Sequence, residues 1–200
     1  MTVTRRTFLK SGTLAAAALA GNADAKASEP TLKVGLVGCG GRGTGAAENV
    51  LQSAPNVEIT ALADVFPERI EKCRKVLSSH EGFKVDDARC FPGLNGYRRL
   101  LECDVDYVLF CTPPAFRPDH LEAAVAAGKH SFVEKPVAVD PVGVRRVVEA
   151  GKKARAKGLG VLAGTLHRYD RKHRETVQRI HDGQIGDVRA VRSMRLGSGL

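Results

Sequence analysis

The chain has 200 residues and a formal net charge of +9; 43% of its residues are hydrophobic and 26% are charged. That length can bury one complete core and part of a second, as in a soluble globular protein. Acidic residues are interleaved with the basic ones, and no basic segment carries the aromatic residues typical of nucleic-acid-binding surfaces, so no nucleic-acid partner is expected. The five cysteines form no C-x-x-C pair, which favours small buried side chains over disulfides or a metal site.

Residues 1–27 have the features of an export signal. Thr4–Lys10 resembles the twin-arginine motif through Arg5 and Arg6, and an apolar run over Gly12–Ala20 follows it. Two A-x-A sequences then offer cleavage sites, and the apolar run is too short to anchor the chain in a bilayer. We expect a twin-arginine signal peptide that engages the export machinery and leads to the periplasm. A chance Arg-Arg pair before an amphipathic helix is the alternative.

A glycine-rich turn follows the first predicted strand, Thr31–Val37, and precedes a helix predicted over Ala46–Ser53. The turn fits the pattern G-x-G-x-x-G at Gly38, Gly40 and Gly43. The first glycine allows the tight turn, the second lets a diphosphate approach the backbone, and the third lets the helix pack closely. Because a helix N-terminus also attracts a diphosphate, this stretch indicates a dinucleotide-binding site.

The second predicted strand, Val57–Ala63, ends in Asp64, which lies 21 residues after Gly43. A carboxylate at this distance can accept hydrogen bonds from the adenosine ribose hydroxyls and would repel a 2′-phosphate. The sequence therefore predicts NAD as the cofactor, although Arg69 on the next helix keeps NADP open. The alternative is that Asp64 only caps the next helix, whose first residue would be Pro67.

Strands and helices continue to alternate along the chain, which predicts an α/β fold with a Rossmann-type, doubly wound parallel sheet over residues 31–165. On the helix predicted over Pro141–Lys157, the residues Val144, Val147, Val148 and Ala154 form the expected buried face. The other predicted elements are helices at Glu68–Ser79, Tyr97–Glu102 and Pro118–Ala127, and strands at Arg89–Phe91, Val105–Thr112, His130–Val133 and Leu159–Ala163.

Several motifs together resemble the Gfo/Idh/MocA family, which includes glucose–fructose oxidoreductase and inositol dehydrogenase. The resemblance extends over residues 31–196. Its most specific part is the pairing of Gly128-Lys129-His130 with Glu134-Lys135-Pro136. The glycine turn, Ala63-Asp64, Thr112-Pro113 and Gly183–Asp187 fit the family as well.

The resemblance implies that Lys135 is the catalytic-site lysine, close to the nicotinamide and the substrate hydroxyl, and that a cis peptide bond precedes Pro136. A lysine just after a buried parallel strand also lies at the sheet edge where such folds bind ligands, although a solvated loop lysine is the alternative. The glycine motif and the resemblance together predict the following cofactor-binding residues: Gly38, Cys39, Gly40, Gly41, Arg42, Gly43, Asp64, Thr112, Pro113, Glu134, Lys135 and Pro136.

Two features depart from the family pattern. Arg117 stands where the family often has histidine, and His120 one helical turn later either substitutes for it or is solvated. Arg168 and His120 are the candidate substrate residues.

Residues 166–200 are expected to form a linking helix and the first strand, Val188–Leu196, of a truncated α+β substrate domain. The general base would then lie beyond Leu200, in a longer protein.

These observations predict an exported NAD(P)-dependent oxidoreductase that transfers hydride between a tightly bound nicotinamide cofactor and a sugar, cyclitol or related polyol. An NAD-dependent glycoside hydrolase that works by oxidation, elimination and addition is the alternative from the same family. A non-catalytic dinucleotide-binding module is the third interpretation. The resemblance also implies a homo-oligomer for the full-length protein.

Overall fold

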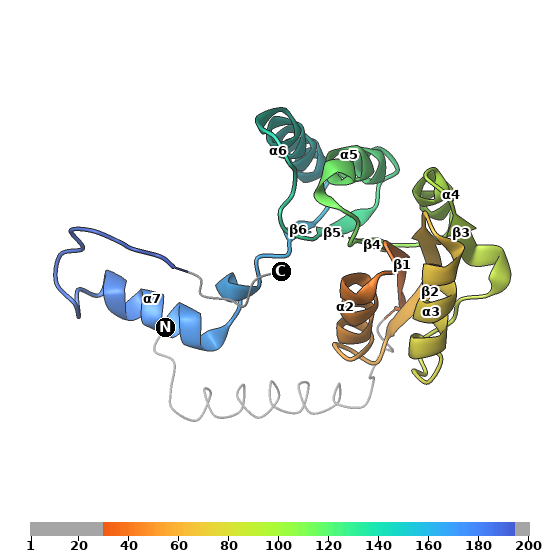
Figure 1. The fold of residues 1–200 in the computed structure, drawn as a ribbon, viewed down its shortest axis with the longest axis horizontal. Coiled ribbons are helices and arrows are strands. Elements are labelled where there is room, and N and C mark those ends of the chain that lie inside the picture. The colour runs from red at the N-terminus through yellow and green to blue at the C-terminus, as the bar shows by residue number, and fades with distance from the viewer. Residues whose placement is uncertain (1–29, 195–200) are drawn as a thin grey trace, which may run out of the picture. The chain divides into compact units, whose positions relative to one another are not determined.

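A computed structural model describes residues 30–194, so the predicted signal peptide over residues 1–27 lies outside the described residues. A single sheet organises the described part of the chain (Figure 1). Its strands are β1 (Leu32–Val37), β2 (Val57–Asp64), β3 (Cys90–Pro92), β4 (Tyr107–Phe110), β5 (His130–Val133) and β6 (Val161–Ala163).

All neighbouring strands pair in parallel, in the order β3-β2-β1-β4-β5-β6. This order confirms the predicted Rossmann-type fold. From β1, the chain adds strands first on one side (β2, β3) and then on the other (β4, β5, β6), and folds of this class bind ligands at the point between β1 and β4 where the side changes. The helices are α2 (Gly41–Leu51), α3 (Pro67–Leu77), α4 (Gly96–Leu101), α5 (Arg117–Ala126), α6 (Pro141–Ala156) and α7 (Arg171–His181).

Two apolar clusters form the core, one on each face of the sheet. Successive residues of a strand point to opposite faces, so Leu36 packs in the cluster with α2 and α3, whereas Val37 packs in the cluster with α4, α5 and α6. Figure 1 shows these helices on the two sides of the sheet. The sheet is therefore doubly wound, and its strands read as apolar runs because both faces are covered.

The first helix begins earlier than predicted. We expected a start at Ala46, but α2 begins at Gly41, inside the glycine turn. Glycine disfavours helix by about 1 kcal/mol relative to alanine, so a helix that begins among glycines is not predicted from the sequence. The close packing of Gly43 against the turn offsets this preference. The ends of the other predicted elements up to β6 lie within two residues of the structure.

The buried face of α6 differs in part from the prediction. Ala154 is buried and Val147 packs half-buried against the core, as predicted, but Val144 and Val148 are 44% and 52% exposed. Gly143 and Ala150 are buried instead. A Cβ on Gly143 would lie 2.9 Å from the Ala138 side chain and 3.2 Å from Pro118 at the start of α5. At Gly143, α6 thus approaches its neighbours too closely for a larger side chain.

The region after β6 contains a 3-10 helix at Leu166–Arg168 and then α7. Residues 187–194 form no helix or strand and pair with no strand of the described range, and 195–200 of the strand predicted over Val188–Leu196 lie outside the described residues. The second domain that this strand would begin stays a prediction. Within residues 30–194, no helix combines the length and hydropathy that crossing a membrane requires.

Candidate active site

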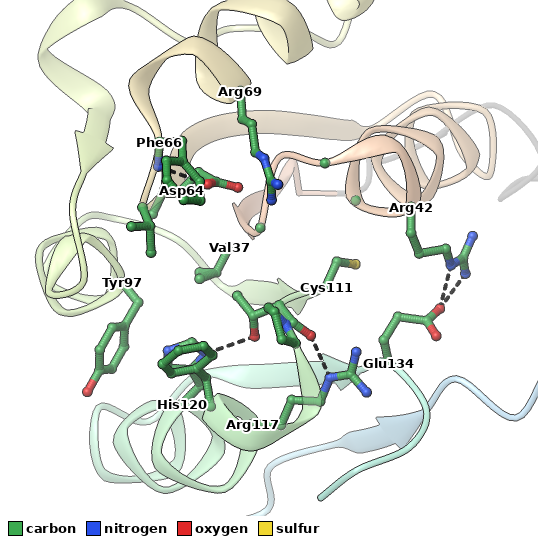
Figure 2. A pocket seen from close by; sticks show the side chains of 18 of the residues that line it. Val37, Arg42, Asp64, Phe66, Arg69, Tyr97, Cys111, Arg117, His120 and Glu134 are labelled. Carbon is green, nitrogen blue, oxygen red and sulfur yellow. Dashed lines mark hydrogen bonds and ion pairs between the residues drawn. The ribbon is translucent and has the colours of Figure 1, made fainter. Parts of the chain in front are cut away.

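A cavity of about 600 Å³ lies at the carboxyl ends of the strands, beside the point where the strand order reverses (Figure 2). Five segments far apart in the sequence line it: the glycine turn, the end of β2 with the start of α3, the stretch after β3 that leads into α4, the loop after β4 with the start of α5, and the segment after β5. Of the predicted site residues, the cavity brings together Gly38, Gly40, Arg42, Gly43, Asp64, Thr112, Pro113, His120, Glu134 and Lys135.

Each glycine of the motif has a different role. Gly38 has a φ of +97°, and a Cβ there would lie 2.8 Å from the Thr112 nitrogen, so only glycine fits the turn. A Cβ on Gly43 would lie 1.7 Å from the Gly38 carbonyl oxygen, which explains the close packing of α2. A Cβ on Gly40 would meet Arg69 Nη1 at 3.9 Å, and no side chain of the described residues caps the N-terminus of α2. The residues therefore fit a diphosphate at this helix end.

Asp64 is buried and helps to shape the turn. Its Oδ2 accepts a hydrogen bond from the Cys39 N–H at 2.7 Å, and its Oδ1 accepts one from the Phe66 N–H at 3.0 Å. The N-cap of α3 is Phe66, with Pro67 in the first turn, so the alternative in which Asp64 is the capping residue is wrong. Each carboxylate oxygen retains capacity for another donor, as binding of ribose hydroxyls requires.

Phe66 and Arg69 line the cavity next to Asp64. The Arg69 guanidinium lies over the Phe66 ring, 4.9 Å from its centroid, and a cation–π contact of this kind holds the charge at the cavity wall. The described site thus offers both a carboxylate and a cation near the expected position of the adenosine ribose. The choice between NAD and NADP depends on the balance between these two charges.

Glu134 joins the glycine turn to the segment after β5. Its buried carboxylate accepts from Arg42 through Oε1, at 2.7 Å from Nε and 2.5 Å from Nη2. Its Oε2 accepts the Lys135 N–H at 3.0 Å. Arg42 and Glu134 are 92 positions apart, and their ion pair bridges two walls of the cavity, as Figure 2 shows.

Lys135 lines the cavity and is exposed, and the Lys135–Pro136 peptide bond is cis, as expected. Its ammonium makes no hydrogen bond or ion pair with any residue of the described range 30–194. An ammonium at this place, beside the expected nicotinamide position, is available to a ligand oxygen. This geometry is compatible with a catalytic lysine and with the solvated-lysine alternative.

His120 is only 6% exposed, so the alternative in which it is solvated is wrong. Its Nδ1 lies 3.1 Å from Thr112 Oγ1, and its ring packs on Tyr97 at a centroid distance of 4.3 Å. Burial lowers the pKa of His120 to about 4, which leaves the ring neutral near pH 7. A neutral ring in contact with Thr112 can orient that hydroxyl toward the cavity.

Arg117 is the site residue that sequence reasoning passed over as a departure from the family. It is buried, its Nε donates to the Thr112 carbonyl at 2.8 Å, and its Nη1 donates to the Pro136 carbonyl. Burial lowers the pKa of Arg117, and the Glu134 carboxylate opposes this shift. The sequence signal that could have placed Arg117 at the site is its position immediately before Pro118, which marks the start of a helix just after the fourth strand.

Four predicted residues do not line this cavity: Cys39, Gly41, Pro136 and Arg168. Cys39 has a buried side chain and contributes its N–H to Asp64, while the Pro136 carbonyl accepts from Arg117. Arg168 is exposed on the 3-10 helix after β6. Among residues 30–194, no group of three histidine, cysteine or carboxylate side chains has an arrangement that could hold a metal ion.

Comparison with known proteins gives the class to which this fold and site belong. The model of the Gfo/Idh/MocA oxidoreductase family, with its NAD-binding Rossmann fold, matches residues 32–162, so the chain belongs to this family. Among curated relatives, an inositol 2-dehydrogenase from Paracoccus denitrificans is 34% identical over 140 residues, which cover 70% of this chain and 38% of the relative. A glycosyl hydrolase family 109 protein from Streptomyces coelicolor is 29% identical over 163 residues, or 81% and 33% of the two chains.

Solved structures agree with this assignment. The scyllo-inositol dehydrogenase of Lactobacillus casei with bound NAD(H) and scyllo-inositol matches with a TM-score of 0.62 and 26% identity, covering 78% of this chain and 43% of that one. A 3-ketoreductase from Actinomadura kijaniata in complex with TDP-benzene and NADP also has a TM-score of 0.62, at 27% identity, covering 80% and 46%. The chain thus spans less than half of the length of these relatives.

Proposed function

We propose that the protein transfers hydride between a nicotinamide cofactor and an alcohol carbon of a cyclitol, sugar or related polyol. The observation that carries this proposal is one cavity lined by the glycine turn, the Asp64 carboxylate and Lys135. The inositol dehydrogenases among the relatives support the substrate class. The bound nicotinamide would supply the hydride acceptor.

Each wall of the cavity has a role in this reaction. The N-terminus of α2 binds the diphosphate, and Asp64 binds the adenosine ribose. The Lys135 ammonium holds the substrate oxygen and stabilises the negative charge that develops on it as the alcohol becomes a carbonyl. His120 is too weak a base to take the hydroxyl proton near pH 7, since burial lowers its pKa to about 4. We therefore place the general base in a second domain that residues 166–200 begin.

The alternative reaction is glycoside hydrolysis with transient oxidation of the sugar. In this scheme a ring carbon is oxidised, the acidified neighbouring C–H permits elimination of the glycoside, water adds, and the hydride returns. The relative named as a glycosyl hydrolase family 109 protein favours keeping this candidate. The same cofactor site and the same lysine would serve both reactions.

A substrate screen with the purified full-length protein separates these functions. It would be supplied with NAD or NADP and with myo-inositol, scyllo-inositol, glucose or nitrophenyl glycosides. Net formation of reduced cofactor supports the dehydrogenase. Release of nitrophenolate without net reduced cofactor supports the hydrolase. Cofactor binding with neither product after a broad screen would leave only the non-catalytic binding module.

The preference for NAD over NADP is proposed to depend on Asp64. Asp64→Asn keeps the shape of the side chain and removes its charge, so the affinity for NADP relative to NAD should rise by about tenfold or more. At ~4 Å, repulsion between two charges is worth roughly 1–4 kcal/mol in this setting. Titration of both cofactors, with Asp64→Ser as a second variant, measures the ratio. An unchanged ratio in both variants, or tighter NADP binding by the wild type, contradicts the assignment.

Export through the twin-arginine pathway is a further part of the proposal, and it rests on Arg5 and Arg6 in the sequence. This route carries folded proteins, and a periplasmic dehydrogenase would need a cofactor that was bound before export and stays bound. Replacing both arginines with lysine should retain the precursor in the cytosol, whereas Lys26→Arg should not. Immunoblots of cell fractions make the comparison, and periplasmic recovery of the double variant rejects the pathway.

A further inference from the structure

Side-chain hydrogen bonds hold the main chain on both sides of Lys135. The Lys135 N–H donates to Glu134 Oε2, and Glu134 is in turn paired with Arg42. One residue further, the Pro136 carbonyl accepts from Arg117 Nη1. The last sheet-type bond before this point runs from the Glu134 N–H to the Phe110 carbonyl at 3.0 Å. From Lys135 onward, the backbone is therefore held by hydrogen bonds to side chains instead of by hydrogen bonds of the sheet.

Arg117 connects this segment to a rigid part of the fold. Its Nε donates to the Thr112 carbonyl, just after β4, while its Nη1 holds Pro136, beyond β5. These strands are neighbours in the sheet, with Phe110 opposite Val133. A buried guanidinium is costly unless its N–H groups are bonded, so the two carbonyls fix its position. Figure 2 shows the Arg117 guanidinium on the side of the segment that carries Glu134, with one of its hydrogen bonds drawn as a dashed line.

We propose that Arg117 is a positioning residue for Lys135, acting through the Pro136 carbonyl. This inference rests on the proposed function, in which the Lys135 ammonium holds the substrate oxygen. A lysine side chain is long and flexible, and here its ammonium has no partner among the described residues, so the anchoring of its backbone determines where it can reach. A misplacement of about 1 Å can cost roughly 10²-fold in rate. Arg42 is a less useful probe, because it also lies in the diphosphate turn.

The test is a double-mutant cycle in the full-length enzyme, with Arg117→Met and Lys135→Ala separately and together. The substrate is the polyol or glycoside oxidised in the screen described above. Arg117→Met should lower kcat by about 10²-fold while the Kd for the dinucleotide stays within a few-fold. In the Lys135→Ala background, it should lower kcat by less than threefold, because its effect passes through the lysine. Arg117→Lys, which can make one of the two bonds, should give an intermediate kcat.

A second measurement needs no substrate. Hydrogen exchange followed by mass spectrometry should show faster exchange in the peptide containing Lys135 in Arg117→Met, with unchanged exchange in peptides from β4 and β5. The matched control is Arg146→Met, which removes a surface arginine that bonds Glu122 across α5 and α6. That control should alter neither kcat nor exchange at Lys135. If Arg117→Met is insoluble, Arg117→Lys enters both experiments in its place.

The possible failures are distinguishable. Equal kcat losses from Arg117→Met in both backgrounds would mean that Arg117 acts independently of Lys135, by direct substrate contact or by general stability, and would overturn the inference. Unchanged exchange at Lys135 would overturn it as well. Full turnover in Lys135→Ala alone would instead refute the role of the lysine in the proposed function. If no substrate is found, the exchange measurement decides the inference by itself.

Discussion

Lys135→Ala in the full-length enzyme is expected to lower turnover by about 10²–10³-fold, the usual effect of losing one preorganised donor to a developing oxyanion. Dinucleotide affinity should change by no more than a few-fold, since in the proposed site the glycine turn and Asp64 carry that binding. The loss should therefore fall on kcat rather than on cofactor affinity. Steady-state kinetics with the polyol from the screen, together with a cofactor titration, measure both quantities.

Lys135→Arg should restore little activity, because a planar guanidinium cannot place one compact charge at the same point. Lys152→Ala is the control, since Lys152 is exposed on α6 and, among residues 30–194, forms an ion pair only with Glu149. It should have wild-type turnover. Near-normal turnover of Lys135→Ala on the true substrate would identify Lys135 as a solvated loop lysine and would move the catalytic site elsewhere.

Gly43→Ala is expected to disrupt the cofactor site through a steric clash rather than through lost chemistry. A Cβ at this position would lie 1.7 Å from the Gly38 carbonyl oxygen, which is main chain and cannot rotate away. Either α2 or the turn must shift, at a cost of roughly 1–3 kcal/mol or more in stability. The shift also displaces the N–H groups that bind the diphosphate. Thermal unfolding and dinucleotide titration should both show the loss.

Gly45→Ala is the matched control, two residues further along the same helix. A Cβ on Gly45 would meet no atom of the described residues within 4 Å outside its own stretch of helix, and alanine favours helix over glycine by about 1 kcal/mol. This variant should be as stable as the wild type or more so, with unchanged dinucleotide affinity. Wild-type binding by Gly43→Ala would show that the third glycine is not a packing requirement here.

Much of the site was predictable because its signals are local. A buried strand that runs into G-x-G-x-x-G, and a carboxylate at the end of the next strand, are each coded within a few residues. The parallel sheet then brings Gly38, Asp64 and Lys135 to one edge, because the carboxyl ends of parallel strands meet there. Local patterns were therefore enough for the fold class and for most of the cavity wall.

The features that escaped prediction depend on tertiary contacts. The start of α2 depends on Gly43 packing against Gly38, and the face that α6 buries depends on how closely it approaches α5. Arg117 gains its role from two carbonyls in separate loops, 5 and 19 positions away. The spacing of apolar residues in the sequence cannot predict such hydrogen bonds, since they form only after β4 and β5 have paired.

The central place of β1 in the sheet has a consequence for synthesis of the protein. β1 is the first strand of the described residues, yet one of its two neighbours, β4, ends about 73 residues later, and Arg42 cannot form its ion pair before Glu134 is made. Closing such long loops is entropically costly until β4 and β5 are present to pair. A ribosome-bound chain that stops before β5 has the glycine turn without its opposite wall. We therefore expect the chain to bind its cofactor only after synthesis has passed Lys135.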